Sequence, residues 1–368
     1  MTSNLYATQL AKILTEYSAP VKKGDLVVIS GSTIAEPLLE ALYEATVKCG
    51  GHPHLSLGLP NNAEIFYTHA QDHQLDYYGP LSMAEVQNVN VYYSVRAAVN
   101  TKRLSRIDAE KLARSQKAGR PGLDVWQERE KAGELIWCIA PWPTQAAAQD
   151  AEMGLQAYEN FVFGACGLFE ADPIAYWTSF RDKQLRLTDW LKGKKHAHVK
   201  GPGIDMTFEF EGRTWVSCHG ERNFPDGEIF TSPIEDSVNG HVEFSFPTVY
   251  GGRELNGVKL TFKDGIVVDA CAAKNEDYLF SQLNADEGAK KLGEFAIGTN
   301  MYIQEFTREI LFDEKIGGTI HMALGLGLFE AGGVNQSVVH WDMVHGMRQD
   351  AEILIDGEVL YRNGAFVI

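Results

Sequence analysis

Residues 24–58 read GDLVVISGSTIAEPLLEALYEATVKCGGHPHLSLG and contain one complete strand–helix–strand unit. The apolar, β-branched run Leu26–Ser30 predicts a buried strand. The segment after it places Leu38 and Leu42 on one face of a helix, and a glycine pair ends that helix before a second strand at His54–Leu57. This order is typical of two parallel strands joined by a crossover helix.

The same alternation continues through the first half of the chain. Strand-like runs at Asn90–Val95 and Leu135–Ile139 flank a largely helical segment, Ser105–Lys131, and another helical stretch, Thr144–Leu191, follows them. Strands that alternate with helices favour a largely parallel sheet covered by helices. We therefore expect residues 1–192 to form an α/β N-terminal domain.

From about His196 the pattern changes to short strands separated by turns. Residues Val258–Ala270 alternate in polarity around a central turn, as a hairpin does. Hairpin turns of this kind are predicted at Asp264-Gly265, Asp356-Gly357 and Asn363-Gly364. One helix is expected near Ala285–Lys291. Residues 193–368 are therefore predicted to form a β-rich (α+β) C-terminal domain.

The composition excludes several classes of protein. Of the 368 residues, 45% are hydrophobic and 22% are charged, which is close to the globular average and rules out a disordered or fibrous chain. The net charge of −16 disfavours nucleic acid and an anionic membrane surface as partners. The densest apolar run, Phe161–Phe169, is far shorter than the ~20 residues that a bilayer crossing needs.

The N-terminal residues lack the basic-then-apolar order of a signal peptide. The five cysteines are far apart and include no C-x-x-C pair, so neither a disulfide framework nor a structural zinc site is expected. We expect a soluble, cytoplasmic protein with reduced thiols at Cys49, Cys138, Cys166, Cys218 and Cys271.

Residues with catalytic potential concentrate in the second half. His340 and Asp342 are two residues apart, so on a strand both side chains point to one face while Trp341 points to the other. The segment Asp313–His321 brings another acid and another imidazole around a glycine pair. Glu228 and Glu294 each follow a glycine and precede an apolar residue; taken singly, they fit solvated strand ends better than metal ligands.

A set of two histidines and three or four carboxylates suits divalent ions such as Zn²⁺, Co²⁺ or Mn²⁺. That many carboxylates exceeds what one tetrahedral zinc uses when a water position stays open. The set fits a two-metal site, in which a bridging carboxylate holds the ions ~3.5–4 Å apart and both polarise one water.

Four segments in this half carry a family resemblance. They are Asn223–Pro233, Leu292–Glu294, Asp313–Gly325 and Asn335–Asp342, in that order. Together they resemble the thermophilic-type metalloaminopeptidases, the family of aminopeptidases T and S. The opening Gly24–Ile29 and Ala35–Leu38 also resemble that family.

The resemblance implies a centre of two divalent metal ions per subunit (Co, Zn or Mn). It implies the ligands Glu228, Glu294, His321, His340 and Asp342, with Glu314 as a further acidic ligand. It also implies a homodimer whose β-rich half is catalytic and which releases the N-terminal amino acid from peptides with a free N-terminus. A carboxylate has to carry a proton to the leaving amine, and Glu228 and Glu294 are both candidates.

Two adjacent positions depart from the family pattern, because Phe329 replaces a proline and Leu328 a tyrosine thought to assist catalysis. The second change affects chemistry, since an isobutyl group cannot donate a hydrogen bond to an oxyanion. Tyr250 and Tyr302 are possible substitutes, although both are expected to be ordinary strand aromatics, and His345 is expected outside the centre. Two alternatives therefore stay open: hydrolysis of a non-peptide amide, and a metal-binding relative with weakened turnover.

Overall fold

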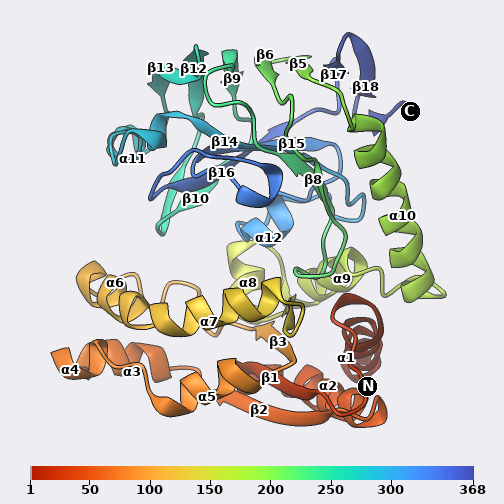
Figure 1. Ribbon diagram of the computed structural model, residues 1–368, viewed down its shortest axis with the longest axis vertical. Helices are drawn as coiled ribbons and strands as arrows, with labels where there is room; N and C mark the ends of the chain where they lie inside the picture. Colours follow the sequence, from red (N-terminus) through yellow and green to blue (C-terminus); the bar gives the residue numbers. More distant parts are fainter. Residues whose placement is uncertain (1) are drawn as a thin grey trace. The chain divides into compact units, whose positions relative to one another are not determined.

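The structure, a computed structural model, describes residues 2–368 and divides into two units. The first extends to Ile174 and includes the returning segment Gly220–Pro225. The second comprises Ala175–His219 and Asp226–Ile368 (Figure 1). No helix among these residues is long and apolar enough to cross a membrane.

The division differs from the boundary expected at residue 192 in two ways. Most of α10 (Pro173–Leu191) belongs to the second unit, because Leu187 and Trp190 pack on that unit's core and the Gln184 amide donates to the Cys218 carbonyl. The segment Gly220–Pro225 returns to the first unit, where it pairs with Ile139 through two backbone hydrogen bonds.

The first unit is built on a four-stranded parallel sheet in the order β2-β1-β3-β4. Its strands are β1 (Leu26–Ser32), β2 (His52–Gly58), β3 (Val91–Arg96) and β4 (Ile136–Pro141). Its helices are α1 (Thr2–Ile13), α2 (Glu36–Lys48), α3 (Asn62–His69), α4 (Asp72–Leu75), α5 (Pro80–Asn88), α6 (Ala109–Ala118), α7 (Arg120–Lys131), α8 (Gln145–Asp150) and α9 (Leu155–Ala165). Short helical turns lie at Leu14–Ser18 and Thr33–Ala35. The predicted parallel sheet is confirmed.

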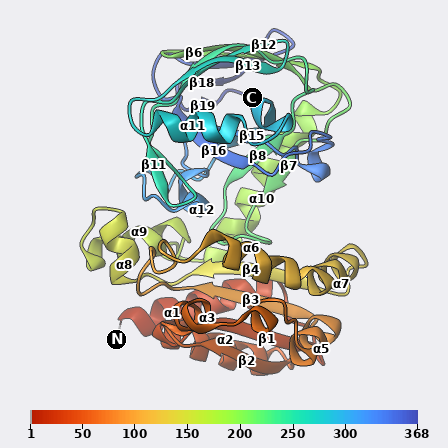
Figure 2. The ribbon, with the colours of Figure 1, turned by 90° about the vertical axis from the view of Figure 1, so that its left-hand side faces the viewer.

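Helices cover both faces of this sheet, as Figure 2 shows. On one face the Tyr92 ring packs edge-on against Trp126 of α7. On the other face the Tyr93 hydroxyl donates to the carbonyl of Ala19, at the end of the first helical segment. Adjacent residues of a strand point to opposite faces, so this one pair of tyrosines anchors both helical layers.

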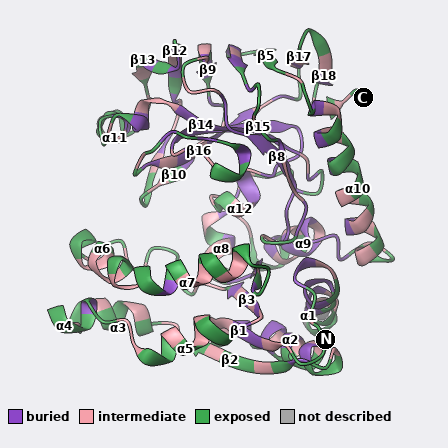
Figure 3. Cartoon of the chain, viewed as in Figure 1, coloured by how far each residue is buried: buried purple, intermediate pink, exposed green. Residues whose placement is uncertain are grey.

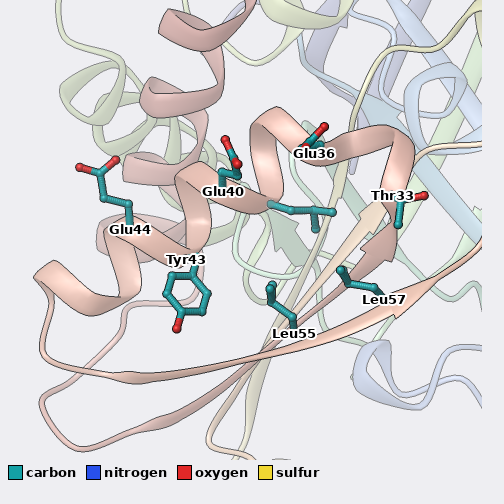
Figure 4. A pocket seen from close by; sticks show the side chains of 8 residues that line it. Thr33, Glu36, Glu40, Tyr43, Glu44, Leu55 and Leu57 are labelled. Atoms are coloured by element: carbon teal, nitrogen blue, oxygen red, sulfur yellow. The ribbon is translucent and has the colours of Figure 1, made fainter.

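The edge strand β2 and helix α2 flank a cavity of about 590 Å³ in the first unit (Figure 4). Leu55 and Leu57 line it from the strand, and three glutamates of α2 border it. None of the candidate metal ligands belongs to this unit, so the cavity is not part of the site described below.

The second unit contains two large antiparallel sheets. The eight-stranded sheet has the order β13-β12-β9-β6-β5-β17-β18-β19 and the five-stranded sheet the order β16-β15-β14-β8-β7, while β10 and β11 form a separate ribbon. The strands are β5 (His196–Gly201), β6 (Ile204–Glu209), β7 (Val216–Cys218), β8 (Glu228–Thr231), β9 (Asn239–Glu243), β10 (Thr248–Tyr250), β11 (Arg253–Leu255), β12 (Lys259–Lys263), β13 (Ile266–Cys271), β14 (Leu292–Gly298), β15 (Thr319–Gly325), β16 (His340–Gly346), β17 (Glu352–Ile355), β18 (Glu358–Arg362) and β19 (Ala365–Phe366).

The core of this unit lies between the two large sheets, whose inner strands are buried in Figure 3. Phe295 of β14 meets Phe208 of β6 with ring centroids 4.8 Å apart. Along the strands of the five-stranded sheet every second residue points into this core, except at a bulge in β14. The opposite face of the same sheet carries the candidate site.

The predicted hairpin turns are confirmed at Asp264-Gly265, Asp356-Gly357 and Asn363-Gly364, where both residues have positive φ. The predicted helix at Ala285–Lys291 is wrong: only Gly288–Lys290 forms a 3₁₀ turn there, because the Asp286 carboxylate accepts from Ala289 and from the Ser337–Val338 loop. The helices are instead α11 (Glu276–Leu283) and the short α12 (Ile310–Asp313), with a 3₁₀ turn at Phe329–Ala331.

Candidate metal centre

Five of the six candidate ligands lie on four adjacent strands of the five-stranded sheet. Glu228 begins β8, Glu294 lies in β14, His321 in β15, and His340 and Asp342 in β16. Their neighbours along the strands, such as Phe295 and Trp341, belong to the core. The alternation expected for His340, Trp341 and Asp342 is therefore what the structure shows, with Trp341 buried.

A β-bulge turns Glu294 toward the site. The register between β14 and β15 shifts between Leu292 and Glu294, so Gly293 is the extra residue. Without this bulge Glu294 would share the core-facing side of Leu292, whereas with it Phe295 takes that side. A Cβ on Gly293 would lie 2.2 Å from the Leu326 carbonyl oxygen, so only glycine fits at this position.

The ligand side chains form a chain of short contacts. His321 Nε2 lies 3.3 Å from Glu228 Oε2 and 3.5 Å from Glu294 Oε1. His340 Nε2 lies 3.3 Å from Glu294 Oε2 and 3.8 Å from Asp342 Oδ1. Each Glu294 oxygen thus faces a different imidazole, and Glu294 is the middle of the centre.

Glu314 follows α12 and completes the cluster. Its carboxylate forms a group with His321 and Asp342 in which one possible ligand atom of each lies within 4.8 Å of the others. Its backbone carbonyl oxygen is 2.9 Å from His321 Nδ1. The structure therefore brings all six candidate residues together.

Both imidazoles are oriented as metal-binding histidines are. His321 Nδ1 donates to the Glu314 carbonyl and His340 Nδ1 donates to the Leu326 carbonyl at 3.0 Å, which directs each Nε2 at the carboxylates. His345 is buried, and its Nδ1 contacts the Glu243 carbonyl at 2.7 Å. It belongs to none of the candidate metal groups among the described residues.

Burial and mutual contact shift the pKa values of these groups. Burial raises the pKa of Glu228 to about 8. Burial also acts to raise the pKa of Glu294, but hydrogen bonds from His321 and His340 lower it to about 2. Against the effect of burial, the same contacts raise the pKa of His321 to about 10 and that of His340 to about 9. Without metal, both imidazoles are therefore positively charged at neutral pH.

The residues present fit divalent metal ions. Glu228 Oε2 and Asp342 Oδ1 are buried and accept no hydrogen bond from any described residue, which is costly unless a cation binds them. Two of the candidate groups, Glu228–Glu294–His321 and Glu294–His340–Asp342, share Glu294. Carboxylate oxygens with imidazole nitrogens are ligands that suit Zn²⁺, Co²⁺ and Mn²⁺.

Sequence reasoning missed a lysine at this centre. Lys315 has a fully buried side chain, and its ammonium lies 3.8 Å from Asp226 Oδ1, 3.8 Å from Glu228 Oε1 and within hydrogen-bond distance of Glu314. In sequence it follows two acids in a glycine-rich turn, where a solvated lysine looks the same. Only the apolar neighbours Phe312 and Ile316 hint at burial.

Leu328 lies on the site face of the sheet, against Phe230 of β8 and Ala296 of β14. Neither tyrosine considered as a substitute belongs to the centre. Tyr250 stacks on Trp341 at 5.1 Å, on the side of β16 opposite His340 and Asp342. Tyr302 is 44% exposed and packs on Tyr176.

A parallel α/β unit followed by a β-rich unit that gathers carboxylate and imidazole groups on one face of a sheet defines a metal-dependent enzyme of two-unit architecture. The family model described as thermophilic metalloprotease (M29) matches residues 5–366, and the chain belongs to this family. The predicted family, fold class and peptide hydrolase activity are thereby confirmed.

Named relatives extend over nearly the whole chain. Aminopeptidase 2 of Geobacillus stearothermophilus is 27% identical and aminopeptidase AmpS of Bacillus subtilis is 25% identical, each alignment covering 96% of both chains. Aminopeptidase T of Thermus thermophilus is 30% identical over 72% of this chain and 71% of its own.

Two solved structures resemble this one. Wild-type AmpT from Thermus thermophilus has a TM-score of 0.84 at 25% identity, with 99% of each chain covered. A 2,5-dihydroxypyridine dioxygenase from Pseudomonas putida has a TM-score of 0.60 at 14% identity, covering 99% of this chain and 97% of its own. The second likeness concerns the fold alone.

Proposed function

We propose that this protein is an aminopeptidase with a dinuclear metal centre, which releases the N-terminal residue from peptides. The observation that carries the proposal is the sharing of Glu294 by two groups of three ligand atoms. The names of its relatives, all aminopeptidases, support the exopeptidase specificity.

The ligands proposed are Glu228 and His321 on one side, His340 and Asp342 on the other, and Glu294 between them. Glu294 is suited to bridge two ions, since its two oxygens face two different imidazoles at 3.5 and 3.3 Å. Glu314 is proposed as a further ligand beside His321 and Asp342. Two divalent ions, when bound, would polarise a water and the scissile carbonyl.

The two central glutamates differ in their ionisation. Glu294 stays ionised because two imidazoles hold its pKa at about 2, which suits a permanent anion. Burial raises the pKa of Glu228 to about 8 in the metal-free protein, and a bound divalent ion would favour its ionised form. Glu228 and Glu294 both stay candidates for carrying a proton to the leaving amine. The excess of carboxylates also suits recognition of a substrate's free α-amino group.

A metal-restoration assay tests the proposal. The purified protein is dialysed against chelator, then supplied with Co²⁺, Zn²⁺ or Mn²⁺, and release of free amino acid from leucyl and other dipeptides is followed. Activity restored by metal, absent on the N-acetylated dipeptides, is the expected result. No release from any dipeptide by protein that has taken up metal contradicts the proposal.

A second candidate function rests on Leu328. If the loss of the family phenol has changed the substrate, the same centre would hydrolyse a non-peptide amide, and N-acylated or cyclic amides would then be turned over in preference to dipeptides. The homodimer implied by the family resemblance and the cytoplasmic location expected from the sequence stay predictions; sedimentation of the purified protein tests the first.

A further inference from the structure

Lys315 is surrounded by carboxylates in the way a metal ion would be. Its side chain is 0% exposed, and oxygens of Asp226, Glu228 and Glu314 all approach its ammonium. Burying an ammonium is unfavourable unless anions compensate it, and here three do so. Nothing in the proposed reaction uses this lysine.

A fourth group of possible ligands borders the same ammonium. Cys218, Asp226 and Glu228 each offer one atom within 4.8 Å of the others. Cys218 pairs directly with Glu228 across β7 and β8. Burial and the neighbouring carboxylates raise the pKa of the Cys218 thiol well above its usual value, and the charge of Lys315 acts in the opposite direction. This trio differs from the proposed centre in its soft sulfur atom.

Charge arithmetic shows what the lysine contributes, given the two-ion centre proposed above. The five carboxylates of Asp226, Glu228, Glu294, Glu314 and Asp342 carry five negative charges. Two divalent ions supply four positive charges and Lys315 supplies the fifth, so the loaded cluster is neutral with neutral imidazoles. A third divalent ion beside Lys315 would leave a buried excess of positive charge.

We propose that Lys315 is a built-in cation that occupies the Cys218–Asp226–Glu228 trio and limits the centre to two metal ions per subunit. The ammonium contacts two of the three residues of the trio, repels a divalent ion from them, and keeps the thiol out of the coordination. This inference rests on the proposed two-metal centre.

The test counts cobalt ions and detects sulfur ligation. Wild type, Lys315→Met and Lys315→Arg are purified in the presence of Co²⁺, freed of loosely bound ions and analysed for metal. Wild type and Lys315→Arg are expected to hold two ions without thiolate-to-cobalt absorption. Lys315→Met is expected to hold three, with that absorption, and the double variant Lys315→Met/Cys218→Ser is expected to lose the absorption. Lys259→Met, at an exposed lysine paired with Glu243, is the matched control.

The outcomes separate this inference from the proposed function. Two ions in wild type and two in Lys315→Met, without sulfur absorption, overturn the role of Lys315 and leave the dinuclear centre intact. A count other than two in wild type contradicts the dinuclear centre itself. If Lys315→Met does not fold, wild type titrated with excess Co²⁺ still decides: thiolate absorption there shows that Lys315 does not exclude the ion.

Discussion

Leu328 is the residue at which this chain departs most clearly from its family pattern, and it lies on the face of the sheet that holds Glu228 and Glu294. It packs against the apolar cluster of Phe230, Ala296 and Ala331. Its backbone N–H donates to the Ser232 hydroxyl at 3.0 Å, which fixes the start of the following turn.

Replacing Leu328 by tyrosine is expected to raise turnover of dipeptides. One oxyanion donor typically changes the rate by ~10²–10³. Leu328→Phe, which brings the same ring without the hydroxyl, is the matched control and should not raise kcat. Steady-state kinetics on a leucyl dipeptide measures the difference, and equal rates for the two variants would show that the phenol does not reach the reacting carbonyl.

His345 shows a different property of a single residue, because it is a buried titratable group outside the centre. Burial lowers its pKa, so the native protein keeps this imidazole neutral at a pH where the unfolded chain protonates it. Below the unfolded value of about 6.5, the unfolded state then binds more protons than the native state. The free energy of unfolding should fall as the pH is lowered from there.

His345→Gln should therefore reduce the acid-side loss of stability. We expect the drop in unfolding free energy between pH 8 and pH 5.5 to be smaller than in wild type, by at most about 1.4 kcal/mol per pH unit. Urea unfolding of the chelated proteins at both values measures it. His52→Gln, at an exposed histidine, is the control and should keep the wild-type drop; an unchanged drop in His345→Gln would contradict the argument.

At the scale of elements, the strands of the site could be predicted from the sequence, but not which face of the sheet each side chain occupies. His340, Trp341 and Asp342 alternate regularly, so the sequence already indicates which side chains share a face. Glu294 does not follow the alternation of β14, because the bulge at Gly293 inserts one residue. The bulge depends on the close approach of Leu326, which is distant in sequence, so no local pattern reveals it.

The same limit applies to charged turns. The segment that holds Asp313, Glu314 and Lys315 reads as a solvated turn, yet the structure buries Asp313 against Thr307 and Lys315 against three carboxylates. A local pattern gives the period of an element, whereas the burial of a turn depends on what packs over it. The family resemblance identified Glu314 as a candidate ligand. Neither the resemblance nor the local sequence pattern indicated that Lys315 is buried beside it.

Gly293→Ala is expected to disturb both the bulge and the centre. A Cβ would lie 2.2 Å from the Leu326 carbonyl oxygen, so β14 or the Leu326 backbone has to move. That carbonyl also accepts from His340 Nδ1, so the move affects Glu294 and His340 together. Overpacking of this kind costs about 1–3 kcal/mol, and we expect weaker metal binding as well.

Gly119→Ala is the matched control for this variant. Gly119 lies between α6 and α7 with φ −74°, and an added Cβ meets nothing closer than 3.4 Å. This change should be neutral or slightly stabilising. Unfolding by urea and equilibrium dialysis of Co²⁺ compare the two variants, and wild-type values for Gly293→Ala would show that the strand accommodates a methyl group.

At the scale of the whole molecule, all candidate ligands belong to the second unit, whose core lies between its own two sheets. The first unit buries separate residues around its parallel sheet, such as Val28, Val89 and Leu135. Metal binding adds stability only to the part of the native structure that holds the ligands. The two units should therefore respond differently when metal is removed.

Calorimetry of metal-loaded and chelated protein is expected to show two unfolding transitions, of which metal shifts one. An ion at a hundred times its Kd adds about 2.7 kcal/mol, and about 2–4 °C of Tm accompanies each kcal/mol in a unit of this size. The metal-dependent transition should thus rise by at least about 5 °C, and the other should stay in place.

His340→Ala removes one of the two proposed imidazole ligands and should abolish much of the shift, whereas His52→Gln, in the first unit, should leave it unchanged. Equal shifts of both transitions would mean that the units unfold together, and no shift in protein shown to bind metal would mean that the six side chains are already satisfied without it. An absence of any shift is not expected, because Glu228 Oε2 and Asp342 Oδ1 are buried and accept no hydrogen bond from any described residue.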